Sequence, residues 1–63
     1  MGEAIRAHRK KKKFSQEKLA EKADLSTTFI SDLERGRVNV AMDSLLRITR
    51  ALDIKLRDIV QDF

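Results

Sequence analysis

The sequence predicts an all-α fold of five short helices in one domain that spans residues 1–63. Proline is absent and the two glycines are Gly2 and Gly36, so few residues would interrupt a helix. No run of β-branched residues alternates with polar residues between turn signals, as a strand would require. A chain of 63 residues without cysteine buries a small core and has no disulfide, so helix packing is its expected source of stability.

The first helix is expected over Glu3–Lys12, with Ile5 and Arg9 on one face. The basic run Arg9–Lys13 at its end has two interpretations that the residues leave open. It is either a solvated helix end, where cations suit the negative end of the helix dipole, or a set of phosphate contacts. His8 has no second metal ligand beside it and is interpreted as a surface or phosphate-facing residue.

A second helix is expected to begin after Ser15, whose hydroxyl oxygen can accept hydrogen bonds from the free N–H groups of the first turn. Its apolar stripe is narrow and contains small side chains that allow another helix to approach closely: Leu19, Ala20 and Ala23. Phe14, just before the cap, can pack against this helix and fix the entry of the chain. Asp24 ends the pattern.

The third helix is expected from Ser26, a second capping residue, to Gly36, which can take the left-handed conformation that ends a helix. Ile30 and Leu33 are its clear core residues. The rest of its surface offers short hydrogen-bonding side chains, one aromatic ring and one cation: Thr27, Thr28, Phe29, Ser31, Asp32 and Arg35. A helix with so little apolar content is stabilised mainly by its neighbours.

Residues 38–41 are expected to form a loop before a fourth, strongly amphipathic helix over Met42–Leu52. Its predicted core residues are Met42, Leu45, Ile48, Thr49 and Leu52. Ile54 then closes the core, and a fifth helix is expected from Leu56, with Ile59, Val60 and Phe63 at helical spacing. Val60 and Phe63 exceed what contact with the core requires, so they are interpreted, with Leu46, as a dimer interface.

The net charge of +4 lies unevenly along the chain. Residues 1–23 carry eight Lys and Arg against three acids, whereas residues 24–63 carry six against seven. This asymmetry indicates an anionic partner, with nucleic acid favoured over a membrane surface or an acidic protein. The longest apolar run, Val40–Met42, is far too short for a signal-peptide core or a membrane span, so no membrane association is expected.

Two segments, SQEKLAEKADLSTTFISDLERGR (residues 15–37) and SLLRITRALDI (residues 44–54), resemble the phage repressor and Cro (XRE-like) family of helix-turn-helix domains. That family includes small bacterial transcription regulators and restriction-modification controller proteins. The resemblance implies a compact bundle like that of lambda repressor, in which the second and third helices form the helix-turn-helix. It also implies that the third helix enters the major groove of DNA.

By this resemblance, four residues of the third helix are candidate base readers: Thr27, Thr28, Ser31 and Asp32. Candidate contacts to the DNA backbone are Gln16, Ser26, Phe29, Arg35, Arg37, Lys10, Lys11, Lys12 and Lys13. The Ser and Thr side chains could instead be caps or solvated surface. Asp32 could accept from a cytosine amino group, or merely repel phosphate and orient Thr28 or Arg35. Phe29 is expected half-buried at the helix flank or against sugar.

The resemblance also implies an ion pair between Arg9 and Glu34, because the family often buries such a pair. The sequence departs from the family where glycine is common, at Lys13, Asp24 and Asp53. It also lacks a proline near Val40 and capping serines near Ala41 and Lys55. These departures predict marginal stability and a positive φ at Asp24.

The predicted function is that of a sequence-specific transcription regulator that binds double-stranded DNA as a homodimer on an inverted repeat. Such a protein would act in a bacterial or phage-infected cytoplasm, associated with the nucleoid. The alternative is a protein-interaction module of the antitoxin or adaptor type with non-specific DNA affinity. One histidine, no cysteine and no glycine-rich phosphate loop offer no nucleophile and base, so no enzyme activity, cofactor, metal or small-molecule ligand is expected.

Overall fold

The computed structural model describes residues 1–59, and this part contains four α-helices and one short 3-10 helix. The helices are α1 (Gly2–Lys11), α2 (Gln16–Ala23), α3 (Thr27–Glu34) and α4 (Met42–Leu52), followed by the 3-10 helix η1 (Leu56–Asp58). The all-helical class is confirmed for this part of the chain. The expected number of five helices is wrong, because only η1 occupies the described part of the fifth one; Val60 and Phe63 lie outside the described residues.

The hydrogen bonds of η1 show why no α-helix begins at Leu56. The N–H of Asp58 donates to the carbonyl of Lys55 at 2.9 Å, and that of Ile59 donates to the carbonyl of Leu56 at 3.1 Å. These i to i+3 bonds make the tighter turn, which is stable only in short pieces. The Asp58 carboxylate accepts from the Lys55 N–H at 2.9 Å, and Ile59 is buried, so this single turn is fixed at both ends.

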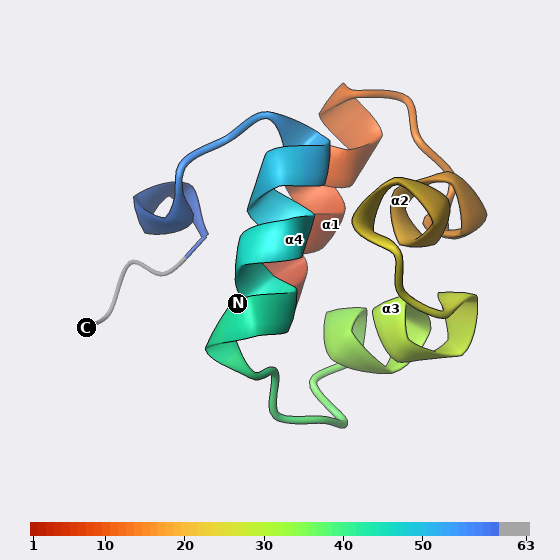
Figure 1. Cartoon of the computed structure of the whole chain (residues 1–63). Coiled ribbons are helices and arrows are strands. Elements are labelled where there is room, and N and C mark those ends of the chain that lie inside the picture. Colours follow the sequence, from red (N-terminus) through yellow and green to blue (C-terminus); the bar gives the residue numbers. More distant parts are fainter. Residues whose placement is uncertain (60–63) are drawn as a thin grey trace.

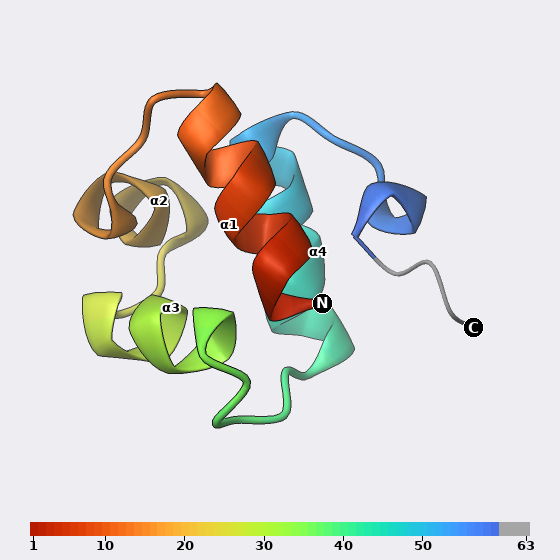
Figure 2. The same ribbon diagram turned by 180° about the vertical axis from the view of Figure 1, so that it is seen from behind.

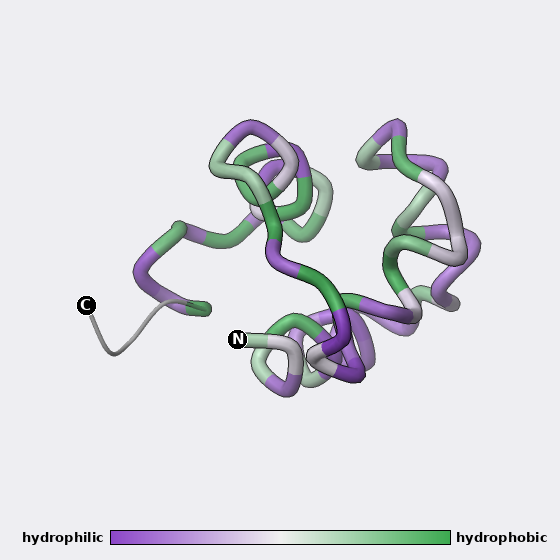
Figure 3. The backbone as a smooth tube through the Cα atoms, turned by 90° about the horizontal axis from the view of Figure 1, so that it is seen from below, coloured by the Kyte–Doolittle hydropathy of each residue, from purple (hydrophilic) through white to green (hydrophobic). Residues whose placement is uncertain are grey.

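Helices α2 and α3 form the helix-turn-helix unit, and α1 and α4 lie on the same side of it in the view of Figure 1 and in the reverse view of Figure 2. Helix α2 contacts both α3 and α4, and α1 also contacts α3. The hydrophobic residues alternate with hydrophilic ones along the helical turns, as an amphipathic helix requires (Figure 3). The fully buried side chains come from all four helices and meet at the centre: Ile5, Leu19, Ile30, Ile48 and Leu52.

Met42 does not face the core as predicted, since 52% of it is exposed. The other predicted core residues of α4 are buried: Leu45, Ile48, Thr49 and Leu52. A helical side chain leans toward the helix N-terminus, and Met42 is the first residue of α4. Its side chain therefore extends past the start of the helix instead of over a helical neighbour.

Three non-glycine residues take the left-handed conformation where the chain leaves a helix. The φ angles are 60° at Lys13, 57° at Asp24 and 55° at Asp53, and Gly36 after α3 has a φ of 73°. The predicted positive φ at Asp24 is confirmed. All four residues stand where the backbone must reverse direction, and at three of them a side chain carries a steric cost of about 1 kcal/mol or more.

Replacing Lys13 with glycine is expected to stabilise the protein by about 1 kcal/mol, because glycine adopts positive φ without strain. Asp24→Gly is expected to be neutral or to stabilise by less, since aspartate tolerates the left-handed region better than lysine. Urea denaturation of both variants measures the change. A clear loss of stability in either variant would mean that the side chain makes a contact worth more than the strain.

Candidate nucleic-acid interface

Helix α3 presents one apolar and one polar side. Ile30 and Leu33 are buried, and Phe29 is half-buried against the core, as expected for the helix flank. At the N-terminus the Ser26 hydroxyl accepts from the Phe29 N–H at 3.0 Å, so this serine caps the helix. No acidic residue occupies the first turn, which leaves the positive end of the helix dipole available to an anion.

The four candidate base readers lie along this polar side and its margin. Thr27 and Thr28 are exposed in the first turn, whereas Ser31 and Asp32 are half-buried in the second. Within residues 1–59, no hydrogen bond or ion pair joins the Asp32 carboxylate to Thr28 or Arg35. The carboxylate of Asp32 is therefore open as an acceptor in the described part of the chain, and both of its expected roles stay predictions.

The charged candidates for backbone contact fall into two separate groups. Arg35 and Arg37 are exposed at the end of α3, where the Arg37 N–H donates to the carbonyl of Asp32 at 2.9 Å. The exposed residues Lys10–Lys13 lie at the end of α1 and in the turn before α2. Figure 1 shows these two groups at opposite ends of the helix-turn-helix unit. The Lys run therefore does not share a local site with the arginines.

Lys22 lies near the second of these groups, the Lys run, although the sequence did not single it out. Its Nζ lies 5.5 Å from the centroid of the Phe14 ring, within range for a cation–π contact. Phe14 is half-buried beside the turn that carries Lys12 and Lys13. The only signal in the sequence was the presence of a lysine on the exposed face of α2, which is too common to identify a contact.

Arg9 and Glu34 form an ion pair between α1 and α3. Arg9 Nε donates to Glu34 Oε2 at 2.7 Å and Nη2 donates to Oε1 at 3.1 Å, with 10% and 4% of the two side chains exposed. Arg9 Nη1 also donates to the carbonyl of Phe14 at 2.8 Å. This bidentate, nearly buried pair fixes the end of α3 to α1 and to the start of α2.

Gln16, the candidate phosphate contact at the start of α2, is part of the same network. Its Nε2 donates to Glu34 Oε1 at 3.2 Å, and its side chain is half-buried. Spacing along the chain could not predict this contact, because 18 residues separate the two positions. The chemistry of the ion pair is a possible signal, because the Glu34 carboxylate has more acceptor sites than the Arg9 guanidinium fills and can accept from a further donor.

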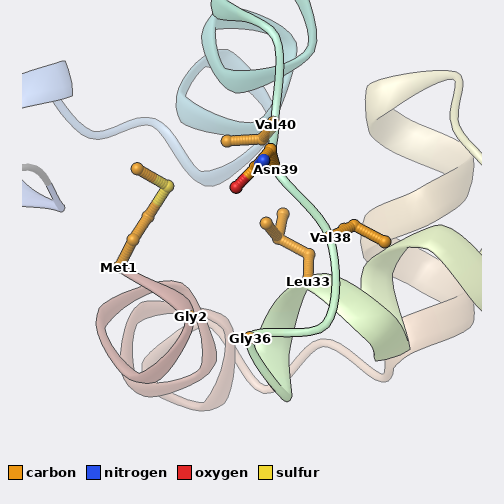
Figure 4. A pocket seen from close by; sticks show the side chains of 7 residues that line it. All are labelled: Met1, Gly2, Leu33, Gly36, Val38, Asn39 and Val40. Atoms are coloured by element: carbon orange, nitrogen blue, oxygen red, sulfur yellow. The ribbon is translucent and has the colours of Figure 1, made fainter.

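A pocket of about 310 Å³ lies on the core side of the end of α3 (Figure 4). Its walls contain no charged side chain and are formed by Met1, Gly2, Leu33, Gly36, Val38, Asn39 and Val40. Elsewhere in residues 1–59, no group of three or more His, Asp or Glu side chains could hold a metal ion, and no helix is long and apolar enough to cross a membrane.

Two candidate dimer residues lie outside the described part, namely Val60 and Phe63. The third, Leu46, is on α4 and 37% exposed. Met42, one turn before Leu46, is also exposed. The described part of the chain therefore provides a small apolar area on α4 where a second molecule could pack.

Comparison with known proteins gives consistent matches over most of the chain. The helix-turn-helix family model matches residues 5–59. Control protein C.BamHI of Bacillus amyloliquefaciens is 43% identical over 60 residues, which cover 94% of this chain and 74% of that protein. The immunity repressor of Bacillus phage phi105 is 42% identical over 60 residues, which cover 95% of this chain but 42% of the repressor.

A solved structure matches the fold as well. The crystal structure of the restriction-modification controller protein C.AhdI from Aeromonas hydrophila superposes with a TM-score of 0.89 and 37% sequence identity. The superposition covers 90% of this chain and 86% of that one. The arrangement of the four helices is therefore that of a controller protein over nearly the whole chain.

Proposed function

This chain belongs to the helix-turn-helix family of DNA-binding transcription regulators, and we propose that it reads one operator sequence with α3 in the major groove. The observation that supports this most directly is the polar side of α3. Thr27 and Thr28 are exposed at its first turn, while Ile30 and Leu33 hold the other side in the core. In helix-turn-helix proteins the N-terminal residues of this helix contact base edges.

The proposed base readers have distinct chemistry. The hydroxyls of Thr27, Thr28 and Ser31 can donate to or accept from a base edge, and a threonine methyl can contact a thymine methyl. The open carboxylate of Asp32 accepts only, which suits the amino group of cytosine. Because these are neutral or acidic groups, affinity must come mainly from contacts to the DNA backbone.

Cations, polar groups and one aromatic ring supply these proposed backbone contacts. The proposed contacts come from α3 and its two ends, from the start of α2, and from the end of α1: Gln16, Ser26, Phe29, Arg35, Arg37, Lys10, Lys11, Lys12 and Lys13. Of these, Ser26 can still donate through its hydroxyl hydrogen, since its oxygen is the acceptor in the cap. Phe29 is half-buried, so it can contact sugar at its edge but cannot intercalate without leaving the core.

The protein is proposed to bind as a homodimer on an inverted repeat, with half-sites about 34 Å apart. Leu46, Val60 and Phe63 are the proposed interface. A small apolar area supports only a weak dimer, and binding of both subunits to DNA would stabilise it. Sedimentation with and without operator DNA tests this: a monomer at tens of micromolar that also binds DNA as a monomer would overturn it.

In-vitro selection of bound duplexes from a random pool tests the function itself. We expect an enriched palindrome, whose half-site spacing would also define the symmetry of the complex. Salt-sensitive binding to every duplex without enrichment would instead indicate the protein-interaction module.

Two single variants separate base reading from backbone contact. Thr28→Ala is expected to relax sequence preference at one position of the half-site, with a loss of about 1–3 kcal/mol on the preferred base. Lys11→Ala is expected to weaken binding to all sequences about equally and to lower the slope of log K against log salt concentration by about 0.9. Titrations of preferred and altered duplexes over a salt series measure both effects. If Thr28→Ala weakens all duplexes equally, Thr28 does not read a base.

A further inference from the structure

Glu34 connects the fold to a side chain at the proposed DNA surface. Its Oε1 accepts from Arg9 Nη2 at 3.1 Å and from Gln16 Nε2 at 3.2 Å, and its Oε2 accepts from Arg9 Nε at 2.7 Å. With 4% of its side chain exposed, Glu34 itself is nearly out of reach of DNA. Gln16 is half-buried, so part of its side chain faces the solvent.

We propose that Glu34 is a positioning residue for DNA binding, which holds the carboxamide of Gln16 so that its second N–H meets a phosphate oxygen. This inference rests on the proposed function. A primary amide has two N–H groups, and Glu34 accepts from one of them. Within residues 1–59 the side chain of Gln16 has no other hydrogen-bond partner. The second N–H is therefore free to donate to DNA.

Holding the amide in advance strengthens such a contact. A free glutamine side chain loses rotamer freedom when it binds, and this loss weakens the complex. In this chain the bond to Glu34 has already restricted the side chain before DNA arrives. The neutral amide also meets phosphate without the large hydration change of an ammonium group.

Arg9 allows the Glu34 carboxylate to hold the Gln16 amide close to a DNA phosphate. An unpaired glutamate would repel DNA, but two hydrogen bonds from the Arg9 guanidinium neutralise Glu34. The third bond of Arg9, to the Phe14 carbonyl, fixes the backbone two residues before Gln16. The same guanidinium thus sets the position of both the backbone and the side chain at the start of α2.

A cycle of variants separates positioning from stability. The background is Arg9→Met with Glu34→Met, which replaces the ion pair by apolar side chains of similar length and usually preserves the fold. Thermal denaturation establishes that this background is folded at the assay temperature. Gln16→Ala is then introduced into the natural chain and into the background, and affinity is measured for a labelled duplex of mixed sequence.

In the natural chain, Gln16→Ala is expected to lower affinity about tenfold, the effect of one hydrogen bond to a charged group. The salt slope should not change, because a neutral side chain displaces no counterion. In the methionine background the same substitution should lower affinity less than about twofold, since the amide is no longer held. An equal loss in both backgrounds, or no loss in the natural chain, would overturn the proposal.

A second measurement needs no DNA. In the NMR spectrum of the free natural chain, one of the two Gln16 amide protons should exchange slowly with solvent, and this protection should vanish in the methionine background. Rapid exchange of both protons in a natural chain that binds duplexes would overturn this inference alone. A protected proton in a chain that binds no duplex would overturn the proposed function together with it.

Discussion

Replacing either Arg9 or Glu34 with alanine is expected to lower the free energy of unfolding by about 3–5 kcal/mol, because the remaining partner becomes an unpaired buried charge. The two side chains are 10% and 4% exposed, so water cannot replace the lost partner without opening the structure. Domains have about 0.05–0.15 kcal/mol of stability per residue, and a loss of this size removes much of what a 63-residue chain has. Urea denaturation monitored by circular dichroism measures the change.

The chain contains a matched control for this experiment. Arg47 and Asp43 on α4 form an ion pair at 3.5 Å, but 45% and 80% of their side chains are exposed. Exposed pairs contribute little, so Arg47→Ala is expected to change stability by less than about 1 kcal/mol. Similar losses for Arg9→Ala and Arg47→Ala would show that burial does not set the strength of the inner pair.

The sequence predicted most of the helical framework because each helix carries its own local signals. Ser15 and Ser26 mark the starts of α2 and α3, and their hydroxyls accept from the Lys18 and Phe29 N–H groups, each at 3.0 Å. The amphipathic pattern of α4 identified four of its buried residues. These signals act over one or two turns, which is the distance at which spacing along a helix is informative.

The prediction failed at two places, the segment from Leu56 and the first residue of α4. Leu56 and Ile59 suit a helix, but the Asp58 side chain bonds the Lys55 N–H and the turn becomes 3-10. Met42 has the right spacing for the core, yet it is the first residue of α4 and stays exposed. Local spacing contains no information on where a neighbouring helix ends.

In the candidate site, too, positions within one helix were predictable from the sequence, whereas contacts between helices were not. The polar residues of α3 follow from their positions in one helix, whereas the pair of Arg9 with Glu34 was inferred from a family resemblance. The contact of Gln16 with Glu34 was missed altogether, since it depends on how α2 and α3 pack. Contacts between residues far apart in one sequence need either a relative or a structure to be found.

Gly2→Ala is expected to destabilise the protein by about 1–3 kcal/mol, the range for overpacking a close contact. A Cβ atom at Gly2 would lie 2.5 Å from the carbonyl oxygen of Leu33 and 2.8 Å from that of Glu34. Both atoms belong to the backbone of α3, so no side chain can rotate away, and α1 and α3 must move apart. Because Glu34 is one of the two residues contacted, separating α1 from α3 would also strain the hydrogen bonds of Glu34 to Arg9 and Gln16. Urea denaturation and the exchange rate of the Gln16 amide measure the two consequences.

The sign of the change in the free energy of unfolding distinguishes overpacking from helix propensity. Helix propensity alone predicts that Gly2→Ala stabilises α1, by about 0.5–1 kcal/mol in a helix interior and less at its end. Gly36 provides the control, because a Cβ there would meet nothing within 4 Å and only its φ of 73° opposes a side chain. Gly36→Asn should therefore be tolerated, since asparagine accepts the left-handed region, while Gly2→Asn should not. A stabilised Gly2→Ala variant would mean that α1 is free to move from α3 and that local propensity outweighs the contact between them.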